Sequence, residues 1–497
     1  MAKKSTNKEL TGAQDLYNFL FEACNIIRGP VSQDNFKDYI TPLLYYKRIS
    51  DVYDEETEEA LISSGGDKEY ASLPEQHRFV IPDGCHWQEV RERTENLGAA
   101  IVGAMRQIEI ANPDTLYGVL SMFSSQKWTN KAILNDSKIR DLIEHLSKRK
   151  LGNKDYPADL MGDAYEILLK KFADDSKAQA GEFYTPRSVV RLLVHILDPQ
   201  PGETVYDPAC GSGGMLIEAI RYMHDDSLCC GSIFGQEKNV VNAAIAKMNL
   251  FLHGASDFNV MQGDTLRDPK ILQGGNIAKF DCVIANPPFS LENWGATEWS
   301  SDKYKRNIYG TPSDSCGDYA WIQHMICSMS SGKGRMAVVM PQGILFRGNQ
   351  EVEIRKQLVE SDLIEAVVTL GDKLFYGTGL SPCFLIIRRM KPAHHSGRIL
   401  MIDGSKILTQ KRAQNILAEN DIDRLYSLYQ NYSDEEDYSR IVTLREIRDK
   451  EYNLSPNRYV VYRKEEIRPY AEVLAEFKHA YEDVKRLEKE FSLLINA

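Results

Sequence analysis

Long hydrophobic runs are missing from this 497-residue sequence, which nowhere contains eighteen consecutive apolar residues. A membrane-spanning helix needs about twenty such residues, so the sequence predicts no transmembrane segment. The N-terminus, Met-Ala-Lys-Lys-Ser-Thr-Asn-Lys, is basic but does not lead into an apolar signal segment. The composition, with 43% hydrophobic and 26% charged residues, is ordinary for a globular protein. Because neither a transmembrane nor a signal segment is predicted, we expect a cytoplasmic protein without a membrane partner.

Paired cysteines and phosphate-binding loops are also missing. The nine cysteines form no C-x-x-C pair, and the close pair of Cys229 and Cys230 is vicinal, which suits an ordinary disulfide poorly. The nearest candidate for a Walker A loop, Gly332-Lys333-Gly334, lacks both the leading glycine and the following serine or threonine. We therefore expect reduced thiols, no metal site and no P-loop.

An excess of positive charge is the third absence. The formal net charge is −11, whereas a protein that grips DNA alone usually has a basic balance, because neutralising phosphates supplies most non-specific affinity. Either the chain does not bind nucleic acid, or another subunit supplies much of the grip.

The first 155 residues are predicted to form a helical N-terminal domain without a catalytic constellation. Apolar residues recur there at the spacing of one helix face, at Leu16, Phe19, Leu20, Ala23, Cys24 and Ile27. The acidic cluster at residues 54–59 is interpreted as a solvated helix face. Residues 64–87 carry glycine, proline and polar residues and are expected to form a long loop.

From about residue 156 the pattern changes to short β-type runs that alternate with helical stretches. The expected strands cover residues 204–206, 232–236, 258–262, 280–285, 335–340, 364–370 and 383–388. Helical patterns lie between the strands, for example at residues 215–222, 240–252 and 321–329. This alternation predicts an α/β domain over residues 156–410 with a mostly parallel sheet and helices on both faces. Because the last two strands lie close together, we expect an antiparallel edge.

The tail, residues 411–497, is charged and helical, and its last stretch carries two interleaved series of apolar residues. The series have a period of seven and consist of Tyr470, Phe477, Val484 and Phe491, and of Val473, Ala480, Leu487 and Leu494. Two such series define an a/d seam of the kind that packs against another helix. The helix could pack on its own domain, but docking onto a partner helix is the favoured interpretation.

A glycine-rich turn follows the first predicted strand. Asp207-Pro208-Ala209-Cys210 leads into Gly211, Ser212, Gly213 and Gly214, and a helix begins at once. Glycines allow the backbone to approach a ligand closely. The acidic Glu237 ends the next strand, 23 residues after Gly214, where it can accept both ribose hydroxyls of a nucleoside. The spacing of the glycines does not fit G-x-G-x-x-G, the pattern of dinucleotide-binding loops, so a nicotinamide dinucleotide is disfavoured. The turn instead resembles the cofactor loop of class I S-adenosylmethionine methyltransferases, which have a Rossmann-like fold.

The strand at residues 280–285 ends in Asn286-Pro287-Pro288-Phe289. Two consecutive prolines cannot donate to a strand ladder and fix a rigid turn. This motif resembles the catalytic motif of amino-group methyltransferases that act on adenine N6. The resemblance implies that the Asn286 side chain and the Pro287 carbonyl accept the two N–H bonds of the amino group, and that Phe289 stacks on the flipped base. It also implies that Asp264 binds the adenine amino group of the cofactor.

Cytosine-C5 methylation would instead need a cysteine nucleophile, and Pro382-Cys383 is a candidate. However, Cys383 opens an apolar run late in the domain, so we interpret it as the start of a buried strand.

A further motif precedes the glycine turn by about 25 residues. It consists of Glu182, Phe183, Tyr184, Thr185, Pro186 and Arg187 and stands before a helix expected to begin near residue 188. It resembles the segment with which these methyltransferases close over the methionine part of the cofactor. Its residue order is particularly typical of modification subunits of type I restriction–modification enzymes.

The resemblance covers about residues 160–390 and implies S-adenosyl-L-methionine as cofactor and double-stranded DNA as substrate. It implies a specificity subunit that sets the target sequence, a second modification subunit and, in some assemblies, a restriction subunit. DNA binding shared with other subunits would then explain the net negative charge. Local cations such as Lys303, Lys305, Arg306 and Arg347 could still contact phosphate, although surface solvation is the expected role of any one of them. Three alternatives remain open: a protein-glutamine methyltransferase, a methyltransferase subunit of another phage-defence system, and an inactive cofactor-binding scaffold.

Overall fold

The computed structural model describes most of the chain. The described residues are 5–116, 118–120, 125–157, 160–162, 164–165, 167–168, 171, 185–223, 231–255, 257–375, 381–411, 414–463 and 470–495. Among them, no helix combines the length and the apolar character that crossing a lipid bilayer requires.

The N-terminal part is helical, as the sequence predicts. Its helices are α1 (Ser5–Ile27), α2 (Lys37–Ser63), α3 (Lys68–Ala71), α4 (Trp87–Arg91), α5 (Leu97–Ala111), α6 (Pro113–Leu116), α7 (Ser125–Thr129) and α8 (Asp136–Leu146). All six apolar residues of the predicted face on α1 are buried, because α1 packs against α2 and α8. The expected long loop at residues 64–87 contains α3 and a single 3-10 turn at Pro74–Gln76.

The acidic cluster at residues 54–59 is only partly the solvated face that the sequence suggests. Asp54, Glu58 and Glu59 are exposed, but Glu55 is buried. Its carboxylate accepts the backbone N–H groups of Asn153 and Lys154 at 2.6 and 3.1 Å. These bonds hold the chain that leaves the N-terminal part against α2.

A nine-stranded sheet forms the centre of the second part. Its strand order is β11-β10-β8-β9-β7-β6-β1-β2-β3, and every neighbouring pair is parallel except those that involve β9 and β11. In chain order the strands are β1 (Val205–Asp207), β2 (Ile233–Glu237), β3 (Phe258–Gln262), β6 (Cys282–Ala285), β7 (Arg335–Pro341), β8 (Ile364–Leu370), β9 (Pro382–Arg388), β10 (Arg398–Gly404) and β11 (Ser439–Thr443).

The seven predicted strands are all present, and the mostly parallel sheet with an antiparallel edge is confirmed. The edge strand is β11, however, which the sequence reading missed together with β10. The strand expected beside that edge, β9, lies inside the sheet and pairs antiparallel with both β7 and β8.

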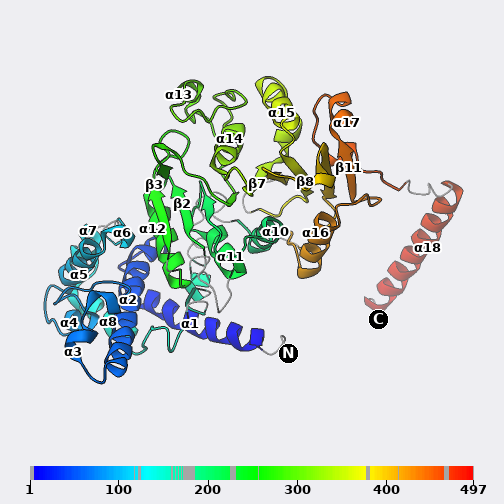
Figure 1. Cartoon of the computed structure of the whole chain (residues 1–497). Coiled ribbons are helices and arrows are strands. Elements are labelled where there is room, and N and C mark those ends of the chain that lie inside the picture. The colour runs from blue at the N-terminus through cyan, green and yellow to red at the C-terminus, as the bar shows by residue number, and fades with distance from the viewer. Residues whose placement is uncertain are drawn as a thin grey trace.

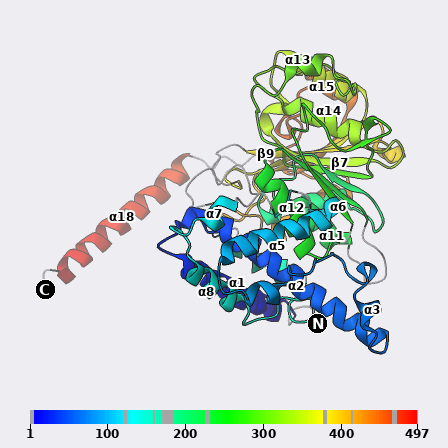
Figure 2. The same ribbon diagram turned by 90° about the vertical axis from the view of Figure 1, so that its left-hand side faces the viewer.

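Helices cover both faces of the sheet (Figures 1 and 2). One face carries α10 (Arg187–Leu197), α11 (Gly214–Met223), α12 (Val240–Leu252) and α16 (Glu419–Asn431), and the other carries α13 (Ala296–Ser300), α14 (Asp318–Ser328), α15 (Gln350–Glu360) and α17 (Leu444–Asp449). Side chains alternate along β7 between the two cores, as the pleat of a strand requires: Ala337 and Val339 face one core, and Met336 and Val338 face the other.

One helix belongs to two cores. On α12, Ala246 and Leu250 pack under the sheet, whereas Met248, Phe251 and Leu252 complete the core of the N-terminal helices. The ring centroid of Phe251 lies 5.2 Å from that of Tyr45 on α2. The N-terminal part is therefore seated directly on α12.

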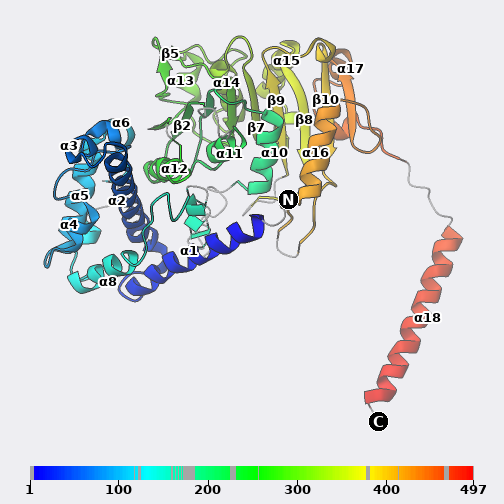
Figure 3. The ribbon, with the colours of Figure 1, turned by 60° about the horizontal axis from the view of Figure 1, so that its bottom comes forward.

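The sheet continues past residue 410, where the sequence predicts that the catalytic domain ends. β11 pairs with β10, and α16 packs against α10, so residues up to 463 belong to the same unit. Beyond them, α18 (Tyr470–Ile495) projects away from the rest of the chain (Figure 3). The boundary at 410 is therefore too early.

The seam on α18 does not pack on its own domain in the part that the structure describes. Its large described side chains, Val473, Phe477, Val484, Leu487 and Phe491, are between 46 and 66% exposed. Docking onto a partner helix stays a prediction.

Candidate functional site

The glycine turn after β1 and Glu237, the last residue of β2, meet at the carboxyl ends of these two parallel strands. Gly211 and Gly213 have φ values of +53° and +85°, which favour glycine because a side chain would be strained there. The N–H of Gly211 donates to the Glu237 carboxylate at 3.0 Å. A second carboxylate oxygen of Glu237 accepts the N–H of Asn239 at 2.7 Å. The turn and the acid that the sequence singled out are thus in direct contact.

Two carboxyl groups at these strand ends are shielded from water. Asp207 ends β1 and is buried, and its carboxylate accepts the N–H of Ala209 at 2.9 Å. Burial, together with the nearby Glu237 carboxylate, raises the pKa of Asp207 to about 8. Burial also raises the pKa of Glu237. Perturbed carboxyl groups beside a glycine turn are typical of a ligand-binding site.

Asn249 on α12 supports the glycine turn through a hydrogen bond. The sequence analysis did not identify this residue. Its side-chain N–H donates to the Ser212 carbonyl at 2.8 Å. On the same helix, Ala246 lies next to Gly213, where an added Cβ would come within 3.4 Å of its Cα atom. Gly213 then passes the chain into α11, whose first residue is Gly214.

Asp264 stands in the loop after β3, where the sequence placed it. One of its carboxylate oxygens accepts the N–H groups of Leu266 and Arg267, each at 3.2 Å. The other lies 2.9 Å from the Lys238 ammonium. The neighbouring Thr265 hydroxyl donates to the Pro208 carbonyl at 2.6 Å, which ties this loop to the glycine turn.

Arg306 is a buried support for the same loop rather than a phosphate contact. Its side chain is 1% exposed and donates to the carbonyls of Thr265 and Leu266, both at 2.8 Å. Asp302 accepts further bonds at 2.7 and 3.0 Å and neutralises the charge. Both expectations for Arg306, solvation at the surface and contact with phosphate, are therefore wrong, whereas Lys303 and Lys305 are exposed.

Asn286 follows β6, which lies beside β1 and is parallel to it. Asn286 therefore lies at the same ends of the strands as the glycine turn. Its side-chain N–H donates to the Thr185 hydroxyl at 2.8 Å. Its Oδ1 atom is buried and accepts no hydrogen bond from the residues that the structure describes. A buried acceptor without a partner costs about 1–3 kcal/mol, so native proteins rarely keep one outside a functional site.

The contact between Asn286 and Thr185 joins two motifs that lie 101 residues apart in the sequence. Pro186 precedes α10 and its carbonyl accepts the N–H groups of Val189 and Val190, and Arg187 begins the helix. The remaining motif residues, Glu182, Phe183 and Tyr184, lie outside the described residues.

The rest of the Asn-Pro-Pro-Phe turn presents an aromatic ring beside a second one. Pro287 is buried, Pro288 is exposed and Phe289 is half-buried. The Phe289 ring centroid lies 6.2 Å from that of Phe375, with 52° between the planes. Phe375 follows β8 and carried no sequence signal, because the two rings come together only through the fold.

A buried ion pair holds the chain directly after Phe289. The Ser290 N–H donates to one carboxylate oxygen of Asp318 at 2.7 Å, and the other oxygen pairs with Arg347. Arg347 also pairs with Glu351 at 2.9 Å. These carboxylates hold the pKa of Arg347 above its usual value, so the side chain stays charged and fixed.

Cys383 lies in the interior of β9 and is completely buried. Burial raises the pKa of its thiol. The structure therefore agrees with the interpretation of Cys383 as part of a buried strand, and not as a nucleophile.

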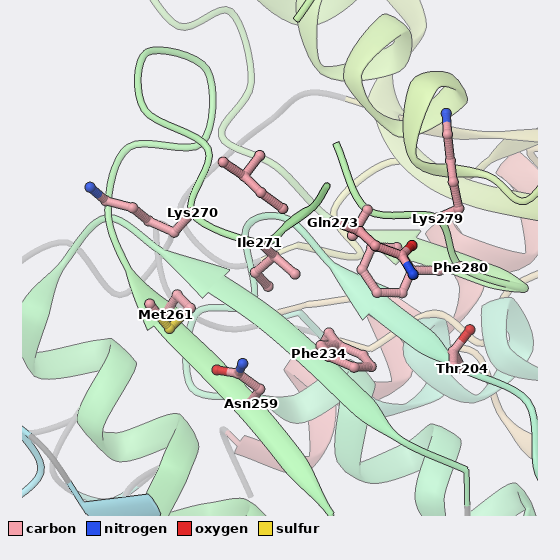
Figure 4. A pocket seen from close by; sticks show the side chains of 11 residues that line it. Thr204, Phe234, Asn259, Met261, Lys270, Ile271, Gln273, Lys279 and Phe280 are labelled. Carbon is pink, nitrogen blue, oxygen red and sulfur yellow. The ribbon is translucent and has the colours of Figure 1, made fainter. Parts of the chain in front are cut away.

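A cavity of about 400 Å³ lies elsewhere on the sheet. The side chains of Phe234 and Met261 rise from β2 and β3 towards the hairpin of β4 (Leu272–Gln273) and β5 (Asn276–Ile277) (Figure 4). Asp207, Glu237 and Asn286 do not line it. The cavity is thus separate from the strand ends that carry the candidate site.

Comparison with known proteins places this geometry in a family. The sequence model described as N-6 DNA methylase matches residues 156–467, and the one described as HsdM N-terminal domain matches residues 16–146. A type I restriction enzyme methylase subunit of Methanocaldococcus jannaschii is 35% identical over 90% of this chain and 78% of its own length. One of Haemophilus influenzae is 31% identical over 70% of this chain and 76% of its own length.

Solved structures agree with the sequence comparisons. The type I restriction–modification methyltransferase subunit of Streptococcus thermophilus is 26% identical, with a TM-score of 0.76 over 90% of this chain and 99% of the other. The family model alone spans well over half of the present sequence. The chain therefore belongs to the N-6 DNA methylase family and is a modification subunit of a type I restriction–modification enzyme, an adenine-specific DNA methyltransferase.

Proposed function

We propose that Asn286, Pro287, Pro288 and Phe289 form the catalytic centre, where the methyl group of S-adenosyl-L-methionine is transferred to N6 of an adenine flipped out of DNA. The observation that carries this proposal is the buried Oδ1 atom of Asn286, which has no partner among the described residues. It follows the strand next to the glycine turn, at the same ends of the strands.

The residues at the glycine turn fit the cofactor. Gly211 and Gly213 bring backbone close to the ligand, and Glu237 presents a carboxylate for two ribose hydroxyls. Asp207 and Ser212 shape the same turn, and Asp264 would receive the adenine amino group once Lys238 moves aside. When bound, S-adenosyl-L-methionine supplies an electrophilic methyl group on a sulfonium.

Asn286 solves the main chemical difficulty of the reaction. The adenine amino nitrogen is a poor nucleophile, because its lone pair is delocalised into the ring. Two acceptors, Asn286 Oδ1 and the Pro287 carbonyl, would bind its two N–H groups, so that the nitrogen becomes pyramidal and more electron-rich. Thr185 fixes the amide by accepting from Nδ2, which leaves Oδ1 for the base.

Two aromatic rings are suited to hold the flipped base. Phe289 and Phe375 face each other obliquely, and a separation close to two stacking distances would admit a planar base after a small adjustment. The segment Glu182–Arg187 would close over the methionine part of the cofactor.

Target choice is assigned to a separate specificity subunit. The chain has a net charge of −11, so its partners must supply much of the grip on phosphate. The exposed seam of α18 is proposed as the contact with helices of the specificity subunit. A second modification subunit, double-stranded DNA and, in some assemblies, a restriction subunit complete the expected partners.

The test is sequencing of DNA from cells that express this chain with and without its specificity subunit. We expect N6-methyladenine in a bipartite motif only when both are present. Methylation by the chain alone would contradict the division of labour. Absence of methylation under both conditions would contradict the DNA substrate and favour a protein-glutamine substrate or a cofactor-binding scaffold, and methylation with a partner of another defence system would reassign the assembly.

A further inference from the structure

A large apolar ring is exposed at the end of β7, next to the catalytic strand. After β7 the chain forms a 3-10 turn, Gln342–Leu345, whose Ile344 and Leu345 are buried. Phe346 comes next, and its side chain is 55% exposed. β7 is the parallel neighbour of β6, so this turn lies at the carboxyl ends of the strands, as Asn286 does.

The backbone on both sides of Phe346 is clamped by buried groups. The Ile344 carbonyl accepts the Tyr319 hydroxyl at 2.8 Å and an Arg355 N–H at 3.3 Å. Arg355, which is buried, also donates to the Arg347 carbonyl at 2.9 Å. Phe346 therefore belongs to a fixed backbone segment and not to a frayed loop, so its exposure is a property of the fold.

The backbone is strained between Phe346 and the start of α15. Asn349 has φ 58° and ψ −138°, a conformation that side chains other than glycine rarely adopt. Such strain persists where the surroundings over-determine the backbone, and it concentrates at functional sites.

A single carboxylate connects Phe346 to the catalytic turn. Arg347, its chain neighbour, pairs with one oxygen of Asp318, and the other oxygen accepts the N–H of Ser290. Ser290 directly follows Phe289. The exposed ring and the catalytic turn are therefore parts of one rigid rim.

We propose that Phe346 inserts into the DNA duplex and occupies the space that the target adenine leaves when it flips. The base itself has other rings to stack on, since Phe289 is half-buried and Phe375 is buried in the site. Phe346 faces outwards on the rim, where it meets the duplex. Apolar side chains of this kind wedge between base steps and offset the cost of unstacking.

This inference rests on the base flipping proposed above, so the experiment separates the two. The assembled complex with its specificity subunit is titrated with DNA that carries 2-aminopurine at the target position, whose fluorescence rises on flipping. Methyl transfer is measured on the same duplexes with adenine in place of 2-aminopurine, because 2-aminopurine lacks the N6 amino group. One duplex has a pairing thymine opposite the target, and the other has an abasic site there, which removes most of the cost of flipping. Wild-type complex that gives no fluorescence rise on either duplex would contradict the flipping itself.

The variants are Phe346→Ala and Phe346→Leu. The control is Met390→Ala, which removes a side chain that is 72% exposed after β9, at the opposite end of the sheet. For Phe346→Ala on the paired duplex, we expect kcat/KM to fall about tenfold or more and the fluorescence rise to shrink, because a stacked ring is lost. On the abasic duplex its activity should approach wild type, and Phe346→Leu should lie between the two.

Several outcomes would overturn the proposal. Wild-type behaviour of Phe346→Ala on the paired duplex would show that the ring does not insert. Equal loss on both duplexes would mean that the ring stacks on the flipped base. Failure of this variant to assemble with the specificity subunit, seen by size-exclusion chromatography, would assign the ring to a protein interface. Cofactor affinity, measured by calorimetry, should be unchanged, since the ring lies outside the glycine turn.

Discussion

Orientation of one amide decides what the site can do. Asn286 donates to Thr185 and therefore presents its oxygen, and not its nitrogen, to the proposed reaction centre. The reversed amide would offer donors to an amino group that itself needs acceptors. The amide that we propose as the acceptor for the adenine amino group is thus oriented by a hydroxyl in another motif, and we propose Thr185 as a positioning residue.

Asn286→Ala should lower methyl transfer by at least about a hundredfold, because the acceptor for the amino group is lost at the point where charge develops. Affinity for S-adenosyl-L-methionine should stay nearly unchanged, since the glycine turn is untouched. Transfer of a radiolabelled methyl group and calorimetric cofactor binding measure the two effects.

The matched variant is Asn286→Asp, which keeps an acceptor oxygen and lets the Thr185 hydroxyl donate instead. It should retain more activity than Asn286→Ala. Equal loss in both variants, or full activity in Asn286→Ala, would be inconsistent with the acceptor role.

Gly213→Asp should abolish cofactor binding, because the added Cβ would lie 3.4 Å from Ala246 on α12, so that the rest of the side chain must displace the proposed cofactor turn. Gly202→Asp is a matched control: Gly202 has φ +84°, close to the +85° of Gly213, but stands before β1 with open space around it. Both variants carry similar backbone strain, about 1 kcal/mol. Equilibrium dialysis should detect lost binding only for Gly213→Asp, and equal affinities would refute the assignment of the turn.

The sequence predicted those helices and strands that carry a local signal, such as a capping residue or an apolar run. Residues 240–252 were predicted as a helix with the bounds of α12, because an apolar run follows Asn239, whose side chain caps the helix by accepting from Val241 and Asn242. β11 was missed because it is a half-exposed edge strand of five residues. Only its pairing with β10 fixes it, and no local pattern encodes that pairing.

The site shows the same division between local and distant information. Motif order and residue type identified the glycine turn, Glu237 and the Asn-Pro-Pro-Phe turn. Arg306 was misjudged because an arginine is usually exposed, and it is buried here only because Asp302 and two distant carbonyls are available. Phe375 and Asn249 act through contacts that form across the fold, so sequence spacing could not reveal them.

Removal of α18 provides the prediction for an element. A chain truncated after residue 466 should no longer co-purify with the specificity subunit, because the exposed apolar seam is lost. Its melting temperature should stay close to that of the full chain, since the seam does not pack on its own domain.

Point variants separate the seam from the helix itself. Phe477→Glu and Val484→Glu place charge in the seam and should weaken the complex, whereas Lys478→Glu, outside the seam, should not. A stable complex with the truncated chain would exclude α18 as the docking element.

At the scale of the whole molecule, α12 is the joint between the two parts. Phe251→Ala should destabilise the chain by about 3–5 kcal/mol, because it empties the contact with Tyr45 inside the N-terminal core. Thermal or denaturant unfolding measures the loss. Met390→Ala, at an exposed position, should change stability by less than about 0.5 kcal/mol. A Phe251→Ala variant as stable as the wild type would show that the two parts are not packed through this helix.

Because α12 packs in both cores, it connects the proposed cofactor turn with the N-terminal part. Asn249 and Ala246 hold the cofactor turn, while Phe251, five residues after Ala246, seats the N-terminal part. If a partner displaced the N-terminal part, a rigid α12 would carry that displacement to the proposed cofactor turn. Thermodynamic reciprocity then requires that the cofactor change the affinity of that partner by the same factor. Cofactor binding and partner binding at the N-terminal part would then be coupled through α12.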